Sequence, residues 1–469
     1  MGILAKSATV ALLFSLSLAA QQNPPATPPL VNLNVAAVDS GGQPVPGLRA
    51  EDFQVLDNGK PRKIVLLRPV HRNGPPATFI LLDLFNADLA ARGLSANEIV
   101  HALEKLESAD NVYLYLLTST AKIFAIHSVA PYGVQQEVTD GPWTRRIKPM
   151  LDEALRQVTA LKSGDDQYPQ LRIGPTWKAL SGLASQFAEV PGPKSFVWIT
   201  QGVLNGFEEP GRMFHVDTAP LREFAETLTV LETASYSVQQ RPNGSITPEN
   251  EGSAGDTLAQ LAALTGGRAY SSDTTAQAIP QAIGNAQRVN YRIVFSPDRL
   301  DGKYHKLRVT TTRKDIKIQT AQTYYAIAAP DVEARNAAVV EAIGRSRFDY
   351  PEIGVATKTA KVDGTPGQFR FDIHVDAPDV LFLKDGTRYR AALGIELAEY
   401  GPDGVRIIPG GAPVDLDMSD EDYAKAMMSG IEITRQGALD EGVRQVRVVV
   451  LDRNSSLAGT VTIPIARNP

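Results

Sequence analysis

The sequence predicts an α/β protein. A doubly wound, mostly parallel sheet is expected in the centre, with an N-terminal β module before it and a C-terminal antiparallel β-sandwich after it. Residues 77–84 and 194–200 each contain a continuous apolar run, at 79–82 and 196–199, which is typical of strands buried on both faces. Amphipathic helical segments separate these runs, as they do in parallel sheets. The flanking segments instead alternate apolar and polar residues between turns, which indicates half-buried antiparallel strands.

The first twenty residues predict a signal peptide. Lys6 supplies a positive charge, and residues 8–20 form an apolar run that ends in small residues. This run is too short to span a bilayer and has the length of a signal peptide's apolar segment. Residues 21–29 are rich in proline and cannot continue a helix. We therefore expect a linker there and an exported mature chain that begins near Gln21; a buried N-terminal helix is the alternative.

Composition excludes several classes of site. The chain has no cysteine, so an exported form has no disulfides, and its stability must come from large cores. Zinc–thiolate sites and thiol nucleophiles are excluded for the same reason. The formal net charge of -5 gives no broad positive field, so nucleic acid is not an expected partner. No later apolar stretch is long enough to span a membrane, so we expect no membrane-spanning segment in the mature chain.

Residues 30–72 are expected to form the N-terminal β module. Residues 30–39 alternate apolar and polar side chains, and the dipeptide Asn58-Gly59 predicts a hairpin because both residues accept positive φ. The central domain is placed at residues 73–288. Its expected strands are residues 77–84, 111–118, 121–127, 194–200 and 234–240, and its expected helices are residues 95–108, 144–162, 176–190, 220–232, 257–265 and 273–287.

The last third of the chain returns to strand patterns. Residues 289–330 are expected to form a short β extension, with a turn at Asp301-Gly302-Lys303. Residues 331–469 are expected to form the C-terminal sandwich, because strands and turns recur there at the spacing of antiparallel sheets. Gly266-Gly267 follows a predicted helix and does not begin one, so it indicates a helix cap, not a nucleotide-binding loop.

Four stretches of the chain resemble the VWFA-related (von Willebrand factor type A-like) exported proteins of acidobacteria. They lie in the same order after a signal peptide, and the resemblance covers residues 30–326; the C-terminal sandwich resembles an extension that some members carry. The biochemical role of that family is poorly defined, so the resemblance implies a VWA-like fold more than a function. The stretches are residues 38–64, 79–86, 190–203 and 261–270 together with 290–309.

The resemblance also implies a place for a divalent cation. Many VWA domains hold one with an Asp-x-Ser-x-Ser loop, a threonine and a second aspartate, because hard cations need several charged oxygen ligands. Here Asp83 matches the first position and Thr176 is aligned with the threonine. Phe85 and Ala87 stand at the serine positions, and Gln201 stands at the second aspartate. We therefore expect a degenerate metal site and no cofactor, with a retained Mg²⁺ or Ca²⁺ as the alternative.

The sequence carries no catalytic motif. It has no Gly-x-Ser-x-Gly, no His-Glu-x-x-His and no phosphate-binding Gly-x-x-x-x-Gly-Lys. We therefore expect a non-enzymatic protein.

Partner binding is expected at the loops that follow the parallel strands, because ligands of open α/β sheets bind at that edge. The candidate binding residues are Asn86, Gln201, Phe207 and Phe214; the two phenylalanines are potential aromatic anchors, or they pack the loop onto its own domain. The expected function is an exported binding or scaffold protein for a protein or cell-envelope component. A metal-dependent adhesion domain and an unrecognised hydrolase are the alternatives.

Overall fold

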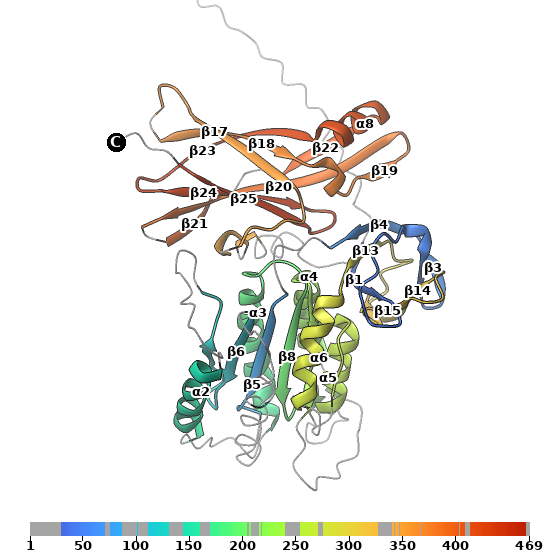
Figure 1. Ribbon diagram of the computed structural model, residues 1–469, viewed down its shortest axis with the longest axis vertical. Helices are drawn as coiled ribbons and strands as arrows, with labels where there is room; N and C mark the ends of the chain where they lie inside the picture. Colours follow the sequence, from blue (N-terminus) through green and yellow to red (C-terminus); the bar gives the residue numbers. More distant parts are fainter. Residues whose placement is uncertain are drawn as a thin grey trace, which may run out of the picture.

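A computed structural model describes residues 30–70, 76–86, 101, 111–130, 144–159, 169–203, 206–207, 215–216, 218–239, 254–270, 275–326 and, with short gaps, 340–465 (Figure 1). The predicted signal peptide, the Pro-rich linker and most of the predicted helix at 95–108 lie outside the described residues.

The prediction of an α/β chain built on a doubly wound, VWA-like parallel sheet is wrong. The described residues are mostly β, with 43% of them in strands and 25% in helices, and several of the sheets are antiparallel. Among the described strands, parallel pairs occur in one sheet, and that sheet is mixed. An apolar run shows that a strand is buried, but it does not show the direction of the neighbouring strand. Residues 118–122 are too short for the crossover that a parallel pair requires, so the strands they join run antiparallel.

This mixed sheet forms the centre of the molecule. Its order is β11-β8-β5-β6-β7, with β12 also paired to β8, and every residue of β5, β6 and β8 is buried. The long apolar runs therefore correspond to strands with both faces covered, as the sequence predicted. The strands are β5 (Thr78–Asp83), β6 (Val112–Leu117), β7 (Ile123–His127), β8 (Lys194–Thr200), β11 (Thr233–Ser235) and β12 (Val238–Gln239).

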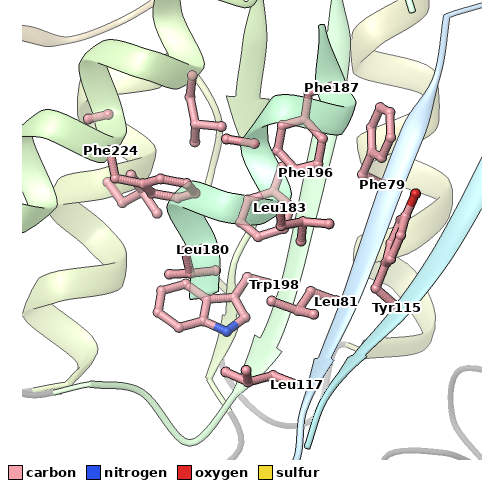
Figure 2. Packing of buried hydrophobic residues seen from close by; sticks show 14 of the residues in the cluster. Phe79, Leu81, Tyr115, Leu117, Leu180, Leu183, Phe187, Phe196, Trp198 and Phe224 are labelled. Carbon is pink, nitrogen blue, oxygen red and sulfur yellow. The ribbon is translucent and has the colours of Figure 1, made fainter. Parts of the chain in front are cut away.

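Helices cover both faces of the mixed sheet. Alternate strand residues point to opposite sides, so Phe79 and Trp198 pack with α3, α4 and α5, whereas Ile80 and Val197 pack with α2 and α6. Figure 2 shows the first side, where aromatic and leucine side chains interdigitate. The helices are α2 (Thr144–Thr159), α3 (Ile173–Phe187), α4 (Ala219–Val230), α5 (Ala254–Thr265) and α6 (Thr275–Arg288); a 3-10 turn, η2 (Pro169–Arg172), precedes α3.

The strands before and after this region form one structural unit, which we call the β unit. β1 pairs with β13 and β2 pairs with β14, both antiparallel, so segments about 250 residues apart share one core. The predicted hairpin is confirmed: Asn58 and Gly59 have φ of 48° and 80° and join β2 to β3. Its elements are β1 (Val31–Val38), η1 (Ala50–Asp52), β2 (Phe53–Asp57), β3 (Lys60–Arg62), β4 (Ile64–Pro69), β13 (Tyr291–Phe295), β14 (Tyr304–Thr311), β15 (Lys317–Gln319) and β16 (Thr323–Tyr325).

The C-terminal part is built from antiparallel sheets. A three-stranded sheet, β17-β18-β23, shares a core with a six-stranded sheet built around the long strand β20. Ser419 begins its helix by accepting a hydrogen bond from the Asp422 amide at 3.1 Å. The elements are β17 (Val355–Lys361), β18 (Gln368–Val375), η4 (Ala377–Asp379), β19 (Leu383–Asp385), β20 (Arg388–Gly401), β21 (Gly404–Ile408), β22 (Val414–Met418), α8 (Asp420–Ser429), β23 (Ile431–Ala438), β24 (Gln445–Asp452) and β25 (Ala458–Pro464).

The arrangement gives the mixed sheet two different ends. The C-terminal part lies beyond the amino ends of the parallel strands, and their carboxyl ends point away from it (Figure 1). The β unit lies beside α5 and α6. The edge at which the sequence placed the candidate site is therefore the end remote from the C-terminal part.

Candidate functional site

Asp83 is the last residue of β5, at the carboxyl edge of the mixed sheet. β5 and β8 are paired in parallel up to Leu82 and Ile199, which brings Asp83 next to Thr200 at the end of β8. The Asp83 side chain is 0% exposed. A buried carboxylate is stable only where hydrogen-bond donors replace its water, so its partners define what this edge of the sheet can do.

Four donors reach the Asp83 carboxylate. Its Oδ1 accepts the backbone N–H of Asn86 at 2.9 Å. Its Oδ2 accepts the Asn86 side-chain amide at 2.8 Å, the Thr200 hydroxyl at 2.7 Å and the Trp198 indole N–H at 3.2 Å. We call Asp83, Asn86, Thr176, Trp198 and Thr200 the Asp83 cluster. Every contact that the carboxylate makes in it is with a donor from the same domain.

Asn86 connects the two residues that the sequence aligned with metal ligands. Its amide nitrogen donates to Asp83 and also to the Thr176 hydroxyl, at 3.0 Å. The Thr176 hydroxyl in turn donates to the Arg172 carbonyl at 2.7 Å. The Asn86 NH₂ group thus bridges the aspartate and the threonine. Both of its hydrogens are used.

Burial raises the pKa of Asp83 above its ordinary value. The hydrogen bonds from Asn86, Thr200 and Trp198 oppose this shift because they stabilise the charged form. Among the described residues, no cationic side chain contributes to this balance. The described partners of the carboxylate are all neutral dipoles.

The remaining candidate residues lie around this cluster or outside the described residues. Gln201 follows Thr200 and is half-buried. Phe207 lies in the short strand β9 (Gly206–Phe207), which pairs with β10 (His215–Val216); its side chain is outside what the structure describes. Phe214 and Ala87 also lie outside the described residues. Asp83 and Thr176 are thus linked through Asn86, whereas the structure does not place the two phenylalanine side chains.

Sequence reasoning missed the roles of Trp198 and Thr200. Both lie in β8, where an apolar run with a terminal threonine is typical of an ordinary buried strand. It also missed the internal bond between Asp83 and Asn86. Asp followed three residues later by Asn, directly after a strand, was the available signal, because aspartate side chains often accept nearby backbone amides.

The Asp83 cluster offers no reactive group to a substrate. Its acid has no exposed oxygen, and its threonine hydroxyls are engaged with Arg172 and Asp83. Elsewhere in the described part of the chain, no group of three or more His, Asp or Glu side chains is arranged to hold a metal ion. No helix in that part combines the length and apolar character needed to cross a bilayer.

No family model and no curated protein matches the chain. Among solved structures it is similar to two crystal structures of the pilus adhesin SpaC from Lactobacillus rhamnosus GG, one of them the open conformation. Both have 8% identity and a TM-score of 0.29, and the matches cover 91% and 88% of this chain. The chain spans 57% of the adhesin's length. At this TM-score the likeness is too distant to bear on fold or function.

Proposed function

We propose that this chain is an exported, non-enzymatic binding or scaffold protein, related to the VWFA-related exported proteins that its four sequence stretches resemble. Its partner is a protein or a component of the cell envelope, and it is contacted by the loops at the carboxyl edge of the mixed sheet. The signal-peptide pattern of residues 1–20 supports export. The observation that carries the proposal is the closure of the Asp83 cluster.

A closed cluster argues against catalysis at this edge. General acid–base catalysis needs a titratable group within hydrogen-bond reach of the substrate. Nucleophilic catalysis needs a hydroxyl or amine beside a base. Asp83 reaches no solvent, and the hydroxyl of Thr176 is directed at a backbone carbonyl. Among the described residues of this edge, the Asp83 cluster thus offers neither kind of group, and we expect a partner to bind the surface of the loops.

The cluster also argues against a metal bridge to the partner. Divalent cations bind oxygen ligands, and here the Asn86 amide nitrogen occupies the position between Asp83 and Thr176. Its hydrogens carry partial positive charge, so a cation between these residues would first have to displace them. Binding at this edge consequently depends on shape and on aromatic contacts.

The test is capture of a partner from an envelope extract of the native cells. The double variant Phe207→Ala/Phe214→Ala should capture at least about tenfold less of the partner than the wild type, since aromatic anchors carry much of an interface's affinity. Its melting temperature should be unchanged. Met428→Ala is the matched control, because Met428 is 84% exposed on α8 in the C-terminal part. Equal capture by wild type and double variant would reject this binding edge.

A further inference from the structure

A second site lies on another side of the mixed sheet. A cavity of about 660 Å³ opens between the segment that follows α5, helix α6 and the β unit near β15. This volume falls within the range of small-molecule binding sites, roughly 300–1,000 Å³. Its polar lining comes from Arg268, Gln281, Asn285, Arg288, Gln319 and Gln322.

Two guanidinium groups give this cavity a positive charge. Arg268 and Arg288 are both exposed, and no Asp or Glu is among the described residues that line the cavity. Among the described residues, the contacts of their side chains are with neutral groups: Arg268 lies over the Tyr270 ring at 5.3 Å, and Arg288 donates to the Asn285 amide oxygen at 3.2 Å. In a chain of net charge -5, two guanidiniums with no carboxylate among their described neighbours mark a place for an anion.

Hydrogen bonds to tyrosine hydroxyls hold three of the amide side chains that line the cavity. The Tyr270 hydroxyl donates to the Gln281 amide oxygen at 2.9 Å. The Gln281 NH₂ group takes no part in this hydrogen bond. The hydroxyl of the buried Tyr236 is hydrogen-bonded to both Asn285 and Gln319. Amides fixed in this way lose little rotamer freedom on binding, which favours affinity.

The backbone at the rim of the cavity is held by a close contact that only glycine permits. A Cβ on Gly267 would lie 1.8 Å from the Ser235 carbonyl oxygen, so only glycine fits there. The close approach allows the Arg268 N–H to donate to that carbonyl at 3.0 Å, and the Tyr270 N–H donates to the Ser237 carbonyl at 2.9 Å. Arg268 and Tyr270 are thereby fixed along the edge of the mixed sheet.

We propose that this cavity binds an acidic saccharide. The two guanidiniums pair with its carboxylate, and the four amides, each of which both donates and accepts, match its hydroxyl groups. Among the described lining residues, the only apolar rings are those of Tyr270 and Pro280, which offer a peptide few apolar side-chain contacts. The site is separate from the carboxyl edge of the sheet, so the proposal stands or falls independently of the proposed function.

The ligand test is calorimetry on the full mature chain with four probes. Digalacturonate should bind with one site per chain. The corresponding neutral disaccharide of galactose should bind about tenfold or more weakly, because it lacks the charge-assisted bonds. Triglutamate and inorganic phosphate should also be weaker. No binding of digalacturonate, or equal or tighter binding of any of the other three probes, would overturn the assignment.

The site test uses two kinds of variant. Arg268→Gln and Arg288→Gln should each weaken digalacturonate binding about tenfold, whereas Arg313→Gln, at an exposed position of the β unit outside the cavity, should not. Gly284→Trp should abolish binding by filling the cavity. A Cβ on Gly284 meets nothing within 4 Å, so the helix tolerates it. Gly182→Trp on α3, equally open, is its control, and unchanged binding by Gly284→Trp would overturn the site.

Discussion

An ionisable side chain is buried near each end of strand β8, Asp83 at the carboxyl end and Lys194 at the amino end. Different parts of the molecule supply their polar partners. At the carboxyl end, Asp83 receives all its hydrogen bonds from the same domain. At the amino end, Lys194 donates to two backbone carbonyls of the preceding turn at 2.8 and 2.7 Å. Glu352 of the C-terminal part and Arg292 of the β unit set its electrostatic surroundings.

The carboxyl end is therefore a closed end, in which one domain supplies all the described partners of the buried group. The amino end is a joint between parts of the chain. Arg292 forms ion pairs with Glu232 of the mixed-sheet region and with Glu352 of the C-terminal part, the second at 3.3 Å. The amino end of the sheet is therefore where three parts of the chain meet. The carboxyl end contributes to the stability of its own domain and presents only loops to the outside.

The largest expected effect concerns the closed end. Asp83→Ala leaves four buried donors without an acceptor, and each costs about 1–3 kcal/mol. We expect the free energy of unfolding to fall by about 3 kcal/mol or more, measured by urea denaturation with tryptophan fluorescence. Asp152→Ala, at an exposed position on α2, should change it by less than about 0.5 kcal/mol. A loss no larger than the control's would show that Asp83 is not closed as described.

The next effect concerns the joint and depends on pH. Burial lowers the pKa of Lys194 from its ordinary 10.5 to about 7; Glu352 opposes the shift and Arg292 adds to it. Between these two values the unfolded chain binds a proton that the folded chain does not, so the stability contributed by Lys194 rises with pH. Measured by urea denaturation, the unfolding free energy of the wild type relative to Lys194→Met should increase from pH 7 towards pH 10.

The exposed Lys178 on α3 supplies the control for that experiment. Lys178→Met should show a difference from the wild type that does not vary over the same pH range. If the Lys194 difference is also flat, the amine is charged in the folded protein and the joint is an ordinary ion pair.

A smaller effect isolates one hydrogen bond of the Asp83 cluster. Trp198→Phe removes the indole N–H that donates to Asp83, whereas Trp177→Phe removes an N–H that has no hydrogen-bond partner in the described structure. The two rings lie 6.1 Å apart in the same core. We expect Trp198→Phe to be more destabilising than Trp177→Phe by about 1 kcal/mol in urea denaturation. Equal losses would assign the effect to ring volume alone.

The smallest expected effect is that of magnesium. Ligands that bind the folded state raise the melting temperature by mass action. Because Asn86 bridges Asp83 and Thr176, we expect millimolar Mg²⁺ to shift the melting temperature by less than about 1 °C. A clear rise that Asp83→Ala abolishes would restore the metal-dependent adhesion alternative.

Local features of the fold could be predicted from the sequence where one residue type determines the backbone. Asn58-Gly59 accepts positive φ, and the prediction of a hairpin there is confirmed. Gly266 has φ of 81° after α5, as a helix cap requires. Long-range strand pairing was not predictable, because no local pattern states that β1 lies beside β13. The antiparallel direction of β7 against β6 did have a local signal, the short loop between them, and was missed.

The candidate site shows the same division. Asp83 and Thr176 could be selected through the family resemblance, and Asn86 through its place after a buried strand. The structure links the three residues through hydrogen bonds of Asn86. The cavity beside α6 could not be found in this way. Its polar residues come from three separate segments of ordinary composition, and the fold alone brings them together.

The pairing of β4 with β13 has a consequence for how this chain can be divided. Tyr291 lies opposite Pro69, and the Val70 N–H donates to the Asn290 carbonyl at 3.0 Å, so the chain leaves the β unit and re-enters it at adjacent points. The whole mixed-sheet region is thus an insertion into a β hairpin. Replacing it with a two-residue turn would close that hairpin without moving either strand, and evolution could add or exchange the insert at the same place without rebuilding its host.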